Sequence, residues 1–112
     1  LDKGTGLKNA KLQGAHLSLP GYSNNPPTLE IYQYEAFENT EHNAPNKRGF
    51  GHIAFEVENV EEIVNKVLTN NGAKWGEITK KKVEGVGVIT FIYMRDPEGN
   101  IIELQDWEKQ IE

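Results

Sequence analysis

Residues 96–104 read Asp-Pro-Glu-Gly-Asn-Ile-Ile-Glu-Leu, and this stretch decides the interpretation of the second half of the chain. Pro97 presets φ and Gly99 can adopt a positive φ, so the first five residues predict a tight turn. A strand is expected from Ile101 to Trp107, and a hairpin is expected over 80–95. The chain therefore ends in a set of antiparallel strands.

A strand and an amphipathic helix come before this hairpin. His52 to Val57 alternates apolar and polar residues, which is typical of a half-buried strand. Apolar residues then recur at helical spacing from Val60 to Leu68. Asn59 can cap the start of this helix, and the Asn-Gly pair at 71–72 supplies a left-handed stop. Residues 50–112 therefore predict a βαβββ module.

The first part of the chain predicts two more strands. One spans 10–19, with a bulge at Gly14 where the alternation slips, and the other spans 28–34. A polar stretch rich in Glu, Asn, Lys and Pro follows at 37–49 and predicts an exposed connector. The fold class is α+β with mainly antiparallel pairing.

Composition narrows the class of protein. The chain has 112 residues, 12 Lys and Arg against 17 Asp and Glu, and no cysteine. The length predicts one domain over 1–112. A net charge of −5 without a basic block argues against nucleic acid and anionic membranes as partners. No apolar run reaches the ~20 residues of a membrane span. We expect a soluble, cytoplasmic protein without disulfides or thiolate metal ligands.

Three charged or titratable residues stand in apolar strands: Glu30, His52 and Glu103. A charged group there is costly unless something pairs with it. Imidazole and carboxylate groups together suit Zn, Ni, Co, Mn or Fe(II), and a carboxylate can also serve as a general base. The alternative is that each residue faces solvent on the wet side of a sheet and has no chemical role.

The other histidines and the aromatic residues receive structural interpretations. His16 competes with His52 for a functional role, but the favoured interpretation is a half-buried histidine of a sheet; His42 is interpreted as a solvated residue of the connector. Tyr32 shares a face with Glu30, where it could line a cavity or simply pack. Trp75 and Trp107 are expected to pack.

The segments 51–57, 60–73 and 91–104 resemble the second half of the vicinal oxygen chelate superfamily. That superfamily includes glyoxalase I, methylmalonyl-CoA epimerase, extradiol dioxygenases and the fosfomycin and bleomycin resistance proteins. The resemblance implies paired βαβββ modules that form a curved mixed sheet around a cavity. Residues 1–36 would be the remainder of the first module, which lacks its opening strand and helix.

The resemblance also implies a divalent metal held at four strand positions. Glu30, His52 and Glu103 match the second, third and fourth positions, and the first has no counterpart in this sequence. An occupied second position favours a lyase or isomerase of the glyoxalase type. Such an enzyme acts on a small substrate with vicinal oxygens through a metal-stabilised enediolate, and Glu103 or a partner carboxylate moves the proton. The alternatives are a non-catalytic binding protein of the resistance type and an extradiol dioxygenase. A homodimer is expected.

Overall fold

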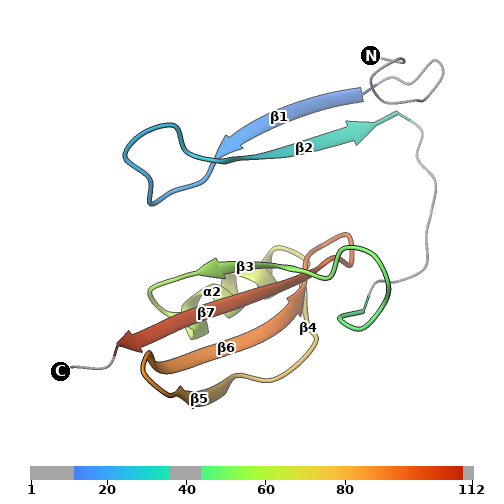
Figure 1. Cartoon of the computed structure of the whole chain (residues 1–112). Helices are drawn as coiled ribbons and strands as arrows, with labels where there is room; N and C mark the ends of the chain where they lie inside the picture. Colours follow the sequence, from blue (N-terminus) through green and yellow to red (C-terminus); the bar gives the residue numbers. More distant parts are fainter. Residues whose placement is uncertain (1–11, 36–43, 110–112) are drawn as a thin grey trace. The chain divides into compact units, whose positions relative to one another are not determined.

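The computed structural model describes residues 12–35 and 44–109. The chain divides into two compact units, Leu1–Thr40 and Glu41–Glu112, and each is described by itself. Most of the predicted connector and His42 lie outside the described residues. The described residues form a two-stranded sheet in the first unit and a five-stranded sheet with a helix in the second (Figure 1).

The first unit is an antiparallel hairpin of β1 (Leu12–Ser18) and β2 (Thr28–Tyr34). Its strands pair residue for residue along their whole length, so the predicted bulge at Gly14 is wrong. Gly14 lies directly opposite Tyr32, and a Cβ at this glycine would overlap the tyrosine ring. The glycine therefore makes room for the ring across the strand pair rather than accommodating an extra residue.

The second unit is a mixed sheet in the order β3, β7, β6, β4, with β5 also paired to β6. Its strands are β3 (Ile53–Glu56), β4 (Ala73–Lys74), β5 (Thr79–Val83), β6 (Gly87–Arg95) and β7 (Ile101–Lys109). β3 runs parallel to β7, and the other pairs are antiparallel. The α+β class and the strands of the final hairpin are confirmed, whereas β4 was not predicted.

The helix α2 (Val60–Thr69) has the ends that its flanking residues favour. The side chain of Asn59 accepts a hydrogen bond of 3.1 Å from the backbone N–H of Glu62, which satisfies a free donor of the first turn. After the helix, Asn71 adopts the left-handed conformation with φ 71°. The left-handed residue is thus the asparagine of the Asn-Gly pair and not the glycine.

The core lies between α2 and one face of the five-stranded sheet. It is formed by buried apolar residues of the helix and the two central strands: Val60, Val64, Ile92, Met94 and Leu104. Asp106, on the same face of β7 as Leu104, accepts a hydrogen bond of 3.1 Å from the backbone N–H of Val60 and fixes the start of the helix to the sheet. The opposite face of β7, which carries Glu103, is not covered by α2 (Figure 1).

No helix in residues 12–35 and 44–109 is long and apolar enough to cross a membrane.

Candidate metal centre

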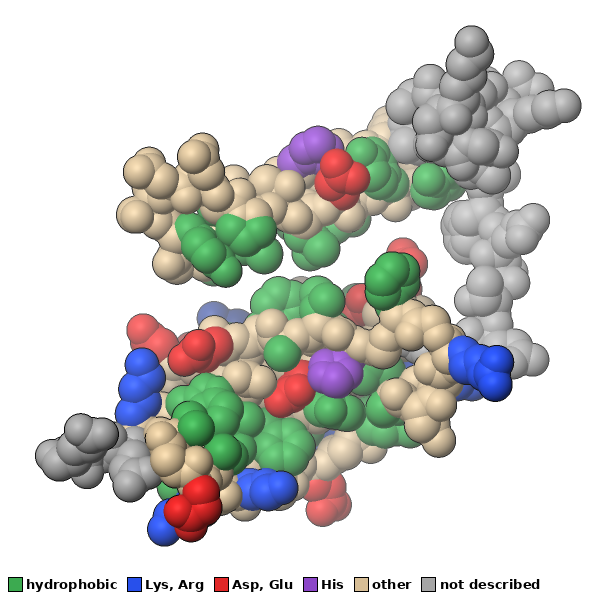
Figure 2. Space-filling view, in the orientation of Figure 1, with side chains coloured by type: hydrophobic (Ala, Val, Ile, Leu, Met, Phe, Trp, Pro, Cys, Tyr) green, Lys and Arg blue, Asp and Glu red, His purple; other side chains and the backbone are tan. Residues whose placement is uncertain are grey.

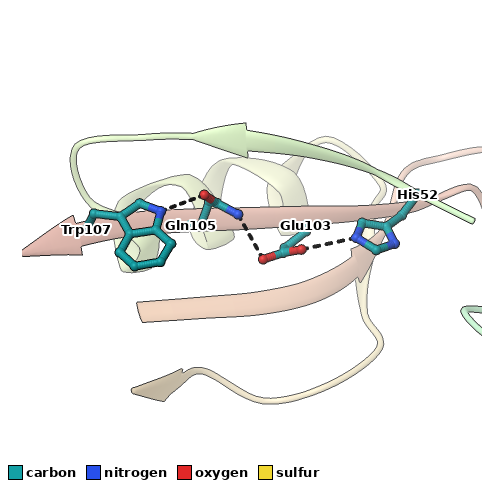
Figure 3. A network of polar contacts seen from close by, with 4 residues as sticks. All are labelled: His52, Glu103, Gln105 and Trp107. Atoms are coloured by element: carbon teal, nitrogen blue, oxygen red, sulfur yellow. Dashed lines mark hydrogen bonds and ion pairs between the residues drawn. The ribbon is translucent and has the colours of Figure 1, made fainter. Parts of the chain in front are cut away.

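The topology of the second unit brings His52 and Glu103 into contact, although 51 positions separate them in the sequence. His52 directly precedes β3, and Glu103 lies on the neighbouring parallel strand β7. In the register of this pair, Glu103 is opposite Ala54, two residues after His52. The imidazole Nε2 lies 3.1 Å from Glu103 Oε1. The side chain of His52 is 29% exposed and that of Glu103 is 12% exposed, so the pair is partly shielded from solvent but still accessible to it (Figure 3).

A chain of hydrogen bonds along β7 orients the Glu103 carboxylate (Figure 3). Gln105 Nε2 donates to Glu103 Oε2 at 3.0 Å, and Trp107 Nε1 donates to Gln105 Oε1 at 2.7 Å. Since an indole N–H can only donate, it fixes the amide with its oxygen toward Trp107 and its nitrogen toward Glu103. Oε2 is then occupied, and Oε1 remains for His52.

The sequence patterns did not reveal this series of hydrogen bonds from Trp107 through Gln105 to Glu103. Trp107 was assigned to packing alone, and Gln105 was not considered. The available signal was the spacing: Glu103, Gln105 and Trp107 alternate along one strand and must therefore share one face.

An aromatic wall flanks the pair. Tyr93 lies opposite Glu103 on β6, and its ring centroid is 4.6 Å from that of His52, with the ring planes inclined by 44°. Phe91 packs edge-on against Tyr93 at 6.3 Å. Figure 2 views the unit from the side away from α2 and shows hydrophobic side chains around the acidic and histidine side chains. Tyr93 therefore restrains the imidazole ring beside the carboxylate.

Glu30 lies in the first unit, on β2, directly opposite His16 on β1. His16 Nε2 is 3.2 Å from Glu30 Oε1, and the two side chains are 59% and 53% exposed. The interpretation of His16 as a half-buried histidine is therefore wrong. Partial desolvation of the phenol, together with the negative charge and hydrogen bonding of Glu30, raises the pKa of Tyr32 on the same face.

Both pairs have the spacing of neighbouring ligands on one divalent ion. With metal–ligand bonds of about 2.1 Å, adjacent ligands lie about 3.0 Å apart in octahedral and about 3.4 Å apart in tetrahedral geometry. The observed separations of 3.1 and 3.2 Å fall within this interval, and imidazole nitrogen with carboxylate oxygen suits such ions. In the described part of the chain, no three or more His, Cys, Asp or Glu residues are placed so that together they could hold a metal ion.

The comparisons with known proteins agree with the fold. The family model of the Glyoxalase/Bleomycin resistance protein/Dioxygenase superfamily matches residues 6–104. The crystal structure of a glyoxalase family protein from Bacillus cereus superimposes with a TM-score of 0.73 at 20% sequence identity. The match covers 95% of this chain and 68% of that chain, and at this identity it shows the fold alone. No curated protein sequence matches this chain.

Proposed function

The chain belongs to the Glyoxalase/Bleomycin resistance protein/Dioxygenase superfamily, and we propose that it is a metal-dependent lyase or isomerase. The substrate class is a small molecule with vicinal oxygens. The observation that carries the proposal is the contact between His52 and Glu103 on the sheet face away from α2, where a hydrogen-bonded chain orients the carboxylate.

We propose that Glu30, His52 and Glu103 hold the divalent metal, which is Zn, Ni, Co, Mn or Fe. Support comes from the donor types and from the 3.1 Å separation within the pair of the second unit. When bound, such an ion supplies Lewis acidity, which makes the C–H next to a coordinated oxygen more acidic.

In this proposal, Glu103 is the catalytic residue. Its Oε2 is held by Gln105, so Oε1 would be the oxygen that binds the ion and that, once released from it, takes up the proton of the substrate carbon and returns it. His52 and the Tyr93 ring behind it orient this side of the carboxylate. The aromatic wall lowers the local polarity and gives the carbon skeleton of a small substrate a surface to rest on.

The proposal is tested by proton exchange. Metal-loaded protein is incubated in D2O with a panel of small 2-hydroxy ketones, starting with hydroxyacetone, and loss of the C–H signal is followed by NMR. Exchange above that of the free ion should be abolished by chelator and by Glu103→Gln. The matched variant Glu108→Gln, on an exposed position of β7, should keep it. Equal exchange by the Glu103→Gln protein, or no exchange with any ketone, contradicts the proposal.

A second candidate function is non-catalytic binding of a small hydrophobic or cationic ligand. The observation that favours it is the aromatic wall of Phe91 and Tyr93, since aromatic faces bind apolar groups and cations. This function predicts ligand binding that is insensitive to chelator and to Glu103→Gln. Proton exchange that is lost both with chelator and with Glu103→Gln supports the catalytic function over non-catalytic binding.

We also propose a homodimer. A two-stranded sheet has little independent stability, and the hairpin exposes Leu17 and Ile31, at 46% and 52%, on the face opposite Glu30. Sedimentation of the wild-type chain should give a dimer, and Ile31→Ser should shift it toward monomer. A monomeric wild type at all concentrations contradicts this.

A further inference from the structure

The first unit contains a second contact of the kind seen at the candidate metal centre. In both places a histidine Nε2 meets a glutamate Oε1, at 3.2 Å for His16 with Glu30 and at 3.1 Å for His52 with Glu103. His16 and Glu30 are directly opposite each other in the register of β1 and β2. Both side chains are more than half exposed, so the pair is not needed to neutralise a buried charge.

The two glutamates, Glu30 and Glu103, occupy corresponding positions in their strands. Glu30 lies between Leu29 and Ile31 on β2, and Glu103 lies between Ile102 and Leu104 on β7. The residue opposite Glu103 on the antiparallel neighbour is Tyr93, whose ring contacts His52 and so lies beside both donor side chains. The residue opposite Glu30 on its antiparallel neighbour is His16.

The side chain directly opposite the glutamate on the antiparallel strand therefore lies beside any ion that the glutamate binds. In the second unit the position carries an aromatic ring that supports the donors. In the first unit it carries a donor itself. An ion bonded to Glu30 Oε1 at about 2.1 Å can also reach His16 Nε2, because their separation equals that of two adjacent ligands.

We infer that His16 is a metal ligand that binds the same ion as Glu30. This inference rests on the proposed function, in which Glu30 is a ligand. It gives the ion a second donor from the first unit, an imidazole nitrogen beside the Glu30 carboxylate. The ligand comes from β1, the strand paired antiparallel with the one that carries Glu30.

The test measures metal binding by the full chain, without any substrate. Metal-free wild type and the His16→Ala protein are titrated with Co(II) by calorimetry and visible absorption. We expect one ion per wild-type chain and at least about tenfold weaker binding by His16→Ala, since even outer-shell partners of metal ligands contribute 10–100-fold. The control Gln13→Ala, on the opposite face of β1, should bind as the wild type does.

A second variant identifies the ligand spectroscopically. The chain has no cysteine, so His16→Cys introduces a single thiol. Under reducing conditions, one equivalent of Co(II) should produce a thiolate-to-cobalt charge-transfer band in this variant and none in the control Gln13→Cys. A band in neither variant, or His16→Ala binding within twofold of a wild type that binds cobalt, overturns the inference and leaves the proposed function standing. A wild type that binds no divalent ion overturns both.

Discussion

The hydrogen-bonded chain on β7 can be tested by replacing Gln105 with methionine. Methionine keeps most of the length and volume of glutamine but has no amide. Glu103 then loses its hydrogen bond from Gln105 Nε2, and Trp107 Nε1 loses its acceptor. Trp107 is only partly buried, so water can serve its N–H, and the main consequence falls on Glu103.

The size of the effect follows from the type of hydrogen bond and its exposure. A hydrogen bond to a charged group is worth about 1.5–3 kcal/mol. The Glu103 side chain is 12% exposed, so water replaces part of the lost interaction, and the lower part of that range applies. The bond orients the carboxylate for the ion, so its loss mainly weakens the metal-bound state, and about 1.5–2 kcal/mol corresponds to roughly 10–30-fold in the metal dissociation constant, because 1.4 kcal/mol is about tenfold. This lies within the range for outer-shell partners of metal ligands.

The assay is competition between the chain and a chelator for Co(II), with urea unfolding of the same metal-free samples. Gln105→Met should bind roughly 10–30-fold more weakly, and Trp107→Phe, which removes only the outer hydrogen bond, should show a smaller loss. Gln33→Met is the matched control, because Gln33 is exposed on the face of β2 opposite Glu30. If the Gln105→Met protein unfolds as the wild type does and binds cobalt within twofold of it, the hydrogen bond from Gln105 does not support metal binding by Glu103.

Three further predictions concern stability and ionisation. Leu104→Ala should lower the free energy of unfolding by about 3–5 kcal/mol in urea, because the side chain is 2% exposed in the core; a loss below about 1 kcal/mol would contradict that packing. Gly72→Ala should cost about 1–3 kcal/mol by the same measurement, since a Cβ there would lie 2.7 Å from the carbonyl oxygen of Arg95, and an unchanged midpoint would show that this approach is not tight. Because the pKa of Tyr32 is raised in the folded protein, its neutral side chain contributes fully to folding stability below the ordinary tyrosine pKa. That contribution is lost as the pH rises through the pKa in the folded state. Glu30→Gln should therefore lower the midpoint of its ultraviolet phenolate titration, and an unmoved midpoint would exclude the charge of Glu30 as a cause.

Local sequence patterns predicted the elements that are stabilised by interactions between residues close together in the sequence. The turn at 96–100 is one example, because the Asp96 side chain accepts from the backbone N–H groups of Glu98 and Asn100, and Gly99 has φ 88°. The strand at 28–34 and the helix starting at Val60 followed from periodicity. In contrast, β4 has two residues and exists through its pairing with β6, so no local pattern marks it.

Features that depend on two distant strands were less accessible. The bulge predicted at Gly14 was wrong because one strand alone does not reveal the tyrosine ring across from its glycine. The family resemblance pointed to His52 and Glu103 as neighbours, and the structure brings them into contact. The pairing of His16 with Glu30 needs the register of the hairpin, and the orientation of Gln105 needs the donor on Trp107. The first is not visible before the strands are paired, whereas the second lies within β7 and was signalled only by the spacing of Gln105 and Trp107 along one strand.

The proposed metal site is tested most directly by equilibrium binding of Co(II) to the metal-free full chain and to three single variants, Glu30→Gln, His52→Ala and Glu103→Gln. We predict one ion per wild-type chain, and binding at least about tenfold weaker in each variant while the fold is retained. Glu108→Gln should match the wild type. A wild-type chain that binds no divalent ion, or three variants that bind cobalt as tightly as the wild type does, would exclude Glu30, His52 and Glu103 as the ligands of a metal.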